Sequence, residues 1–226
     1  MAELPIQADG LRTNVALKLT HMGLTFDEEL AYANVADLAD RAREVGNFIR
    51  IDMEESAHVD ATLRIYRRLR EAGFENVGTV LQSYLYRTSG DLADLLPLAP
   101  NLRIVKGAYL EPPERAFPEK ADVDRSFLEL VESGLLGGAY IAVATHDERI
   151  IGRVRELADE RGIGLDRFEF QMLYGVRSGL QREVAAAGYK VLVATPFGPD
   201  WYPYLMRRLA ERPANVGFLL KNLLRG

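Results

Sequence analysis

A single lysine, placed after a short apolar run, is the first residue whose position suggests chemistry. Lys106 ends the run Leu102–Val105 and is followed by Gly107, Ala108 and Tyr109. Small residues after a buried strand let the backbone come close to a bulky ligand, and parallel α/β proteins bind ligands at the carboxyl ends of their strands. One interpretation is a Schiff-base lysine, as in barrel aldolases. The other is a solvated lysine at a strand end, and the residues alone leave both open.

Polar side chains lie at or near the ends of the other apolar runs as well. They are Lys18 and Thr20, Asp52 and Glu54, Gln82 and Tyr84, Thr145, His146 and Asp147, and Glu169, Gln171 and Tyr174. The interior of a barrel is otherwise packed with branched apolar side chains, so inward charges imply partners or a ligand. The pattern predicts a convergent site of mixed charge.

Two adjacent arginines, Arg207 and Arg208, lie on a helix expected to begin after Asp200 and to stop before Pro213. Neighbours on a helix diverge by about 100°, yet two guanidinium groups can converge on one carboxylate or phosphate from a helix that overhangs a pocket. The alternative is a solvated face in which Glu211 lies one turn beyond Arg207.

Metal binding is disfavoured by the histidine content. The chain has 3 histidines, and none of them forms an HxH or HExxH pattern. Two pairs have ligand character: His146 is adjacent to Asp147, and Asp52 and Glu54 share one face of a strand. For His146, a hydrogen-bonded histidine at a strand end is the alternative. No metal is therefore predicted.

Strand-like and helix-like segments alternate along the chain. The predicted strands are Asn14–Leu19, Phe48–Met53, Val77–Tyr84, Leu102–Ala108, Tyr140–Thr145, Phe168–Leu173 and Lys190–Thr195. The predicted helices between them are Phe26–Val45, Val59–Ala72, Arg149–Arg161 and Leu180–Ala187. Glu111–Lys120 is predicted to be a long irregular loop and a candidate lid.

Such alternation is typical of βαβ units with a parallel sheet. The repeat favours a (βα)8-type, TIM-like barrel in a single domain over residues 1–226, with seven strands in this chain and the first βα unit absent. A doubly wound sheet is the alternative, but no glycine-rich turn follows the first strand. An unclosed barrel exposes strand edges, which predicts self-association.

The composition places the chain among ordinary globular proteins, with 48% hydrophobic residues, no cysteine and a formal net charge of -5. The acidic balance gives no support for nucleic-acid binding. The start, MAELPIQADG, has neither a basic nor an apolar region, so no signal peptide is expected. We predict a cytoplasmic protein and leave open a peripheral contact with the inner membrane.

Seven motifs in order resemble the proline dehydrogenase family, the flavin-dependent barrel enzymes of proline catabolism, and in particular its monofunctional bacterial type. They are LKLTHMGL, FIRIDMEES, VGTVLQSYLYR, LRIVKGAYLEP, VATHD, FEFQMLYGV and DWYPYLMRRLAERPAN, and they span nearly the whole chain. The resemblance implies oxidation of L-proline to 1-pyrroline-5-carboxylate, with FAD as cofactor and a quinone as electron acceptor.

The resemblance also implies roles for individual residues. Asp52 and Arg103 are implied as the catalytic acidic and basic groups. The implied substrate-binding residues are Lys18, Tyr109, Leu173, Arg207 and Arg208. The implied FAD-binding residues are Met53, Gln82, Lys106, Gly107, Ala108, Thr145, His146 and Glu211.

The chain departs from the family pattern at two places. The family has helices and a βα unit ahead of the LKLT strand, where this chain has Met1–Thr13. Ala194 occupies a position where the family has a tyrosine that packs against bound proline. A catalytically impaired barrel scaffold is therefore an alternative to the active enzyme, beside the aldolase interpretation of Lys106.

Overall fold

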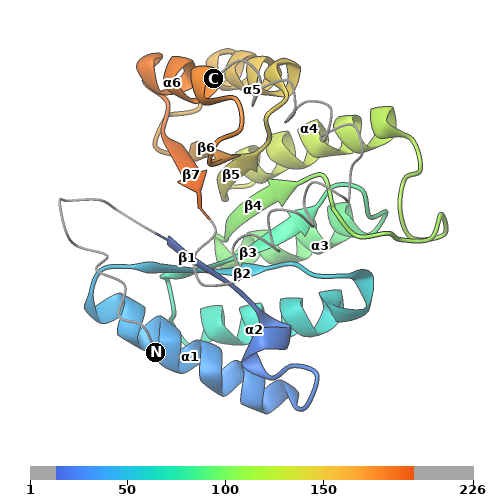
Figure 1. The fold of residues 1–226 in the computed structure, drawn as a ribbon, viewed down its shortest axis with the longest axis vertical. Helices are drawn as coiled ribbons and strands as arrows, with labels where there is room; N and C mark the ends of the chain where they lie inside the picture. Colours follow the sequence, from blue (N-terminus) through green and yellow to red (C-terminus); the bar gives the residue numbers. More distant parts are fainter. Residues whose placement is uncertain (1–13, 196–226) are drawn as a thin grey trace.

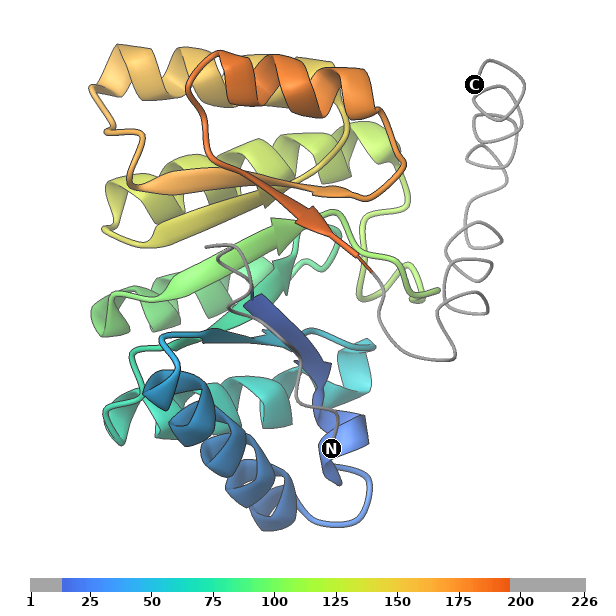
Figure 2. The same cartoon turned by 60° about the vertical axis from the view of Figure 1, so that its left-hand side comes forward.

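The computed structural model describes residues 14–195. Within them, seven parallel strands form one sheet whose spatial order follows the chain order, from β1 to β7. The strands are β1 (Asn14–Lys18), β2 (Phe48–Asp52), β3 (Val77–Gln82), β4 (Asn101–Val105), β5 (Tyr140–Ala144), β6 (Phe168–Leu173) and β7 (Val191–Ala194). The sheet curls, and the helices cover its outer side (Figures 1 and 2). This half-barrel confirms the predicted α/β barrel fold with seven strands.

Six α-helices connect the described strands. They are α1 (Glu28–Glu44), α2 (Val59–Glu71), α3 (Thr88–Leu95), α4 (Lys120–Leu136), α5 (Glu148–Arg161) and α6 (Ser178–Ala186). Four of them agree with the predicted helices to within two residues, whereas α3 and α4 were not predicted. The helix predicted after Asp200, the residues ahead of β1 and the absence of a first βα unit lie outside the described residues.

Local sequence explains where the helices begin and stop. Asp27 caps α1 by accepting a hydrogen bond of 2.8 Å from the Leu30 amide, and Asp147 caps α5 in the same way. Gly162 ends α5 in the left-handed conformation. The buried faces of α2 and α4 carry apolar residues at helical spacing, such as Phe127 in α4, which is fully buried. One contiguous core therefore fills the space between helices and sheet.

The segment between β4 and α4 is irregular, as predicted, but it is anchored at several points. Glu111 accepts hydrogen bonds of 2.7 and 2.6 Å from the backbone amide and hydroxyl of Ser56. The Tyr86 hydroxyl donates to the Pro113 carbonyl at 2.9 Å, and the Phe117 amide donates to the Tyr84 carbonyl at 2.8 Å. These bonds join the loop to the segments that follow β2 and β3.

A buried arginine crosses the sheet beneath the strand ends. Arg50 is 2% exposed, and its guanidinium donates to the carbonyls of Thr79 and Asn101 at 3.0 and 2.9 Å and to the Asn101 side chain at 2.6 Å. Gly78 provides the space, because a Cβ there would lie 2.4 Å from Arg50 Nη1. Burial, with the nearby charge of Arg103, lowers the pKa of Arg50 to about 10. Arg50 thus links β2, β3 and β4 through one side chain.

Candidate active site

The register of the sheet brings the predicted catalytic residues to one face. Lys18 pairs with Asp52 in register, and paired residues of parallel strands point to the same side. Asp52 forms an ion pair with Arg103 across β3, and their side chains are 24% and 17% exposed. Lys18 Nζ donates to the Tyr109 hydroxyl at 3.3 Å. The structure therefore unites Lys18, Asp52, Arg103 and Tyr109 in one cluster.

A buried polar chain continues from Arg103 into the sheet. Arg103 Nη1 lies 3.4 Å from Gln171 Oε1, and Gln171 Nε2 donates to Glu169 Oε1 at 2.7 Å. The other oxygen of Glu169 accepts from Tyr140 at 2.9 Å and pairs with Lys190 Nζ at 2.7 Å. Burial works against the charge of Glu169, but its hydrogen bonds with Lys190 and Gln171 outweigh it and hold its pKa below the ordinary 4.5.

The alternation of polar residues in FIRID and FEFQ is a sequence signal for these buried polar contacts. Arg50 and Asp52 are two residues apart, as are Glu169 and Gln171, so each pair lies on one face of its strand. Glu169 and Gln171 were expected at a strand end, but no role was predicted for either. Nothing in the sequence shows that Tyr140 and Lys190 serve as the partners of Glu169.

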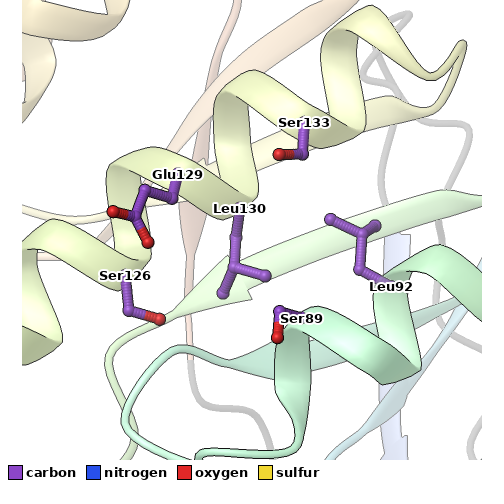
Figure 3. A pocket seen from close by; sticks show the side chains of 6 residues that line it. All are labelled: Ser89, Leu92, Ser126, Glu129, Leu130 and Ser133. Carbon is purple, nitrogen blue, oxygen red and sulfur yellow. The ribbon is translucent and has the colours of Figure 1, made fainter.

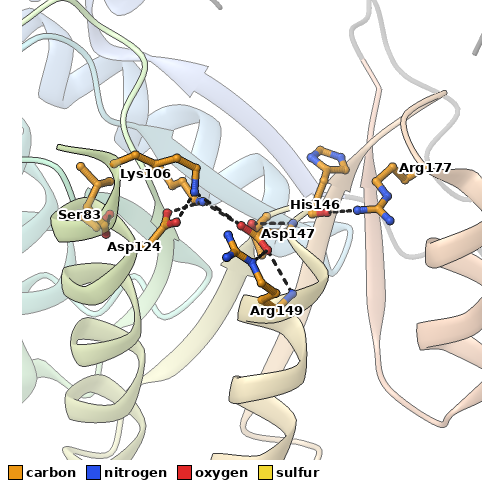
Figure 4. A network of polar contacts seen from close by, with 10 residues as sticks. Ser83, Lys106, Asp124, His146, Asp147, Arg149 and Arg177 are labelled. Atoms are coloured by element: carbon orange, nitrogen blue, oxygen red, sulfur yellow. Dashed lines mark hydrogen bonds and ion pairs between the residues drawn. The ribbon is translucent and has the colours of Figure 1, made fainter. Parts of the chain in front are cut away.

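Lys106 lies in a second network, on the helix side of β4 (Figure 4). Its Nζ is 2.5 Å from Asp124 Oδ1 and 3.5 Å from Asp147 Oδ2. Lys120 also pairs with Asp124. Burial alone would raise the pKa of Asp124, but the two ammonium groups hold it below its ordinary value. Asp124 was not predicted as a site residue, because it lies within the unpredicted helix α4.

This network bears on the aldolase interpretation. A Schiff-base lysine acts through a neutral amine held against apolar walls. The amine of Lys106 instead contacts two carboxylates, one from α4 and one from the amino end of α5. The geometry therefore disfavours an aldolase, and Lys106 is not part of the Asp52–Arg103 cluster.

His146 is engaged with the backbone at the end of β6. Its Nε2 accepts a hydrogen bond of 2.9 Å from the Leu173 amide, and its carbonyl accepts one of 3.0 Å from Arg177. Burial and, less strongly, the Arg177 charge lower the pKa of His146, so the neutral ring is favoured. Thr145 accepts from the Asp147 amide at 3.1 Å. Residues 14–195 contain no cluster of three or more metal-ligating side chains.

Leu173 and Ala194 are neighbours on one face, because the two residues pair in the register of β6 with β7. Both are partly buried, and Met53 and Gln82 are buried. Ala108 is exposed. The predicted residues Arg207, Arg208 and Glu211 lie outside the described residues.

A groove of about 300 Å³ lies elsewhere, between α3 and α4 on the outside of the sheet (Figure 3). Its lining consists of Ser89, Leu92, Ser126, Glu129, Leu130 and Ser133. None of the predicted site residues lines it. No described helix has the length and apolar character needed to cross a bilayer.

Comparisons with known proteins decide the family. The family model described as proline dehydrogenase matches residues 2–221. Proline dehydrogenase of Deinococcus radiodurans is 50% identical over 97% of this chain and 72% of its own length. The chain belongs to the proline dehydrogenase family. Proline dehydrogenase 2 of Bacillus subtilis is 46% identical over 94% of this chain and 70% of its own length.

Solved structures share the fold of this chain. Proline utilization A (PutA) from Bdellovibrio bacteriovorus superposes with a TM-score of 0.79 at 24% identity over 92% of this chain. A PutA mutant from Bradyrhizobium japonicum gives a TM-score of 0.79 at 25% identity over 93%. This chain spans only 26% and 25% of those two PutA chains.

Proposed function

We propose that this chain is a proline dehydrogenase that oxidises L-proline to 1-pyrroline-5-carboxylate, the first step of proline catabolism to glutamate. The observation that carries the proposal is the cluster of Lys18, Asp52, Arg103 and Tyr109 at the strand ends of a family barrel. Oxidation removes a hydride from the ring carbon beside the proline nitrogen and a proton from the nitrogen, and it leaves a C=N bond.

The chain's own side chains supply orientation and charge. The Lys18 ammonium, 5.9 Å from the centre of the Tyr109 ring, is placed to attract the substrate carboxylate. Arg207 and Arg208 are proposed to complete that clamp. Asp52 balances the charge of Arg103 and holds its guanidinium group in place. A fixed substrate ring lowers the entropic part of the barrier.

Features of the strand ends fit FAD as the cofactor. Gln82 is 3% exposed, and its Nε2 donates to the Glu54 carbonyl at 3.2 Å, while its buried Oε1 has no hydrogen-bond partner in the described protein. A buried acceptor without a partner could accept a hydrogen bond from the N–H edge of a flavin ring. Gly107 and Ala108 carry little or no side chain to obstruct a flat ring. FAD, when bound, supplies the acceptor for the two electrons.

The remaining proposed FAD contacts come from Met53, Lys106, Thr145, His146 and Glu211. Lys106 has three protons to donate, so it can serve its two carboxylates and a ligand together. We propose a quinone as the final electron acceptor, in line with the family. Peripheral membrane contact and self-association stay predictions, which vesicle flotation and analytical ultracentrifugation can check.

The test is a visible absorption spectrum of the purified protein before and after L-proline is added without oxygen. A flavin spectrum that bleaches with proline supports the proposal. A protein that stays colourless with excess FAD, or a flavin that proline does not bleach, contradicts it.

The impaired-scaffold alternative is tested at Ala194. Its neighbour Leu173, a proposed substrate-binding residue, pairs with it in register and lies on the same face of the sheet. We expect Ala194→Tyr to tighten proline binding by about 1–2 kcal/mol through ring packing. A wild-type protein without turnover whose Ala194→Tyr variant turns over proline would identify the chain as an impaired scaffold.

A further inference from the structure

The buried carboxylate of Glu169 does not touch the proposed substrate site, but Gln171 connects it to Arg103 in that site. Glu169 is 1% exposed, and three donors from three elements or loops converge on it: Tyr140 at 2.9 Å, Gln171 at 2.7 Å and Lys190 at 2.7 Å. A buried charge is costly to maintain unless it is fully paired. Glu169 meets that condition, so its position and its charge are both fixed.

The charge of Glu169 determines which way the Gln171 amide is turned. An ionised carboxylate can only accept hydrogen bonds, so Gln171 must present its NH2 group to it. The Gln171 oxygen then faces the opposite way, toward Arg103 at 3.4 Å. Arg103 can only donate. A glutamine between an obligate acceptor and an obligate donor has one satisfactory orientation.

We propose that Glu169 is a positioning residue for the active site: through the Gln171 amide, it holds the Arg103 guanidinium in the orientation that pairs with Asp52. The inference rests on the proposed function, because Arg103 matters only if its cluster binds and oxidises substrate. Lys190 and Tyr140 anchor the carboxylate at the opposite end of this chain of contacts.

Glu169→Gln is the direct test, since it keeps the shape and removes the obligate acceptor. The Gln171 amide can then turn and point its NH2 group at Arg103, donor against donor. We expect kcat/KM for proline to fall about tenfold, in keeping with the loss of one charge-assisted hydrogen bond. Asn76→Ala is the control for lost stability, because Asn76 donates to the Ala39 carbonyl at 2.8 Å away from this chain of contacts; it should leave kcat/KM within about twofold.

A double-mutant cycle separates positioning from general damage. In a Gln171→Met background the connection is already broken, so Glu169→Gln should lower kcat/KM by less than about twofold further. The wild type and the Glu169→Gln variant, both of which keep Gln171, are also compared in the flavin-free state by NMR of their 15N-labelled glutamine side chains. The Gln171 amide protons, held by Glu169, should exchange slowly in the wild type and quickly in Glu169→Gln.

Two results would overturn the inference. One is an equal loss of kcat/KM from Glu169→Gln in both backgrounds, and the other is an unchanged kcat/KM despite fast exchange of the Gln171 amide. If the wild type itself does not oxidise proline, the proposed function fails instead, while the amide-exchange result still reports whether Glu169 fixes Gln171.

Discussion

Gly107 offers the sharpest test of the packing at the proposed cofactor site. It has φ +114°, and an ideal Cβ built on it would lie 2.2, 2.4 and 2.5 Å from three ring atoms of Tyr84. Contacts below 3.0 Å are essentially never made by real Cβ atoms. Tyr84 is 9% exposed, so its ring has little room to retreat. Gly107→Ala must therefore strain the backbone and displace a packed ring at the same time.

The expected cost has two parts. A non-glycine residue at positive φ costs about 1–2 kcal/mol, and overpacking costs typically about 1–3 kcal/mol. Gly107→Ala should then lower the free energy of unfolding by about 2–5 kcal/mol in total. Gly138 provides the matched control, because it has φ +91° and a Cβ added there would meet no atom of the described residues within 4 Å beyond its chain neighbours. Gly138→Ala should show the backbone part alone.

Urea unfolding, followed by circular dichroism, measures both variants and the combination of Gly107→Ala with Tyr84→Ala. Removing the ring relieves the clash. The double variant should therefore lose about 1–3 kcal/mol less unfolding free energy than the two single variants lose together. Strict additivity, or a Gly107→Ala loss no larger than that of Gly138→Ala, would refute the close approach of Gly107 to Tyr84.

Two further predictions concern the charged groups. Because the pKa of His146 in the folded protein lies below its ordinary 6.5, the unfolded chain takes up the proton first. The stability that neutral His146 provides is present above pH 6.5 and is lost as the pH falls through the lowered pKa; His146→Gln should flatten this part of a stability profile measured by urea unfolding. Asp124→Asn should cost about 1–3 kcal/mol, since it breaks the partly buried pair with Lys106 at 2.5 Å. Asp122→Asn should cost under about 0.5 kcal/mol, because the Asp122 side chain is 33% exposed and its partner Arg125 is 65% exposed. Equal losses for the two aspartates in thermal melts would contradict the second prediction.

Apolar runs alone were sufficient to predict the strands, but they did not give every strand end. Phe168–Leu173 was predicted with the bounds it has in β6, because polar and turn-forming residues flank it on both sides. The run predicted as Leu102–Ala108 begins at Asn101 and ends at Val105 in β4. Lys106 turns to the helix side to meet Asp124, and Gly107 adopts positive φ. Neither the Lys106–Asp124 ion pair nor the positive φ of Gly107 can be predicted from hydropathy.

Helix α4 was not predicted, although its sequence contains apolar residues at helical spacing. Val123, Phe127, Leu130 and Val131 recur at helical spacing and are all buried, yet a charged amino-terminal turn obscures the pattern. The pairing of Asp52 with Arg103 is a different case. It crosses the intervening strand β3, so it depends on the curvature and stagger of the sheet, which no local pattern encodes.

The linkage made by Arg50 has a consequence for how the fold opens and forms. In the described sheet every strand pairs only with its neighbours along the chain, which keeps contacts local and favours stepwise growth of the sheet. The β2–β3 pairing has a register of two residue pairs, Ile49 with Val77 and Arg50 with Gly78, whereas the other strand pairs have four or five.

At the boundary between β2 and β3, which we call the seam, the Arg50 side chain therefore supplies hydrogen bonds where the backbone pairing is short. When the Arg50 guanidinium leaves its carbonyl acceptors and the Asp52–Arg103 ion pair breaks, β1 and β2 can separate from the rest of the sheet as one cooperative unit. Native-state hydrogen exchange would then show two subglobal openings, one containing β1 and β2 and the other β3 to β7. We expect the same seam to be the place where β1 and β2 join the other five strands of the described sheet during folding.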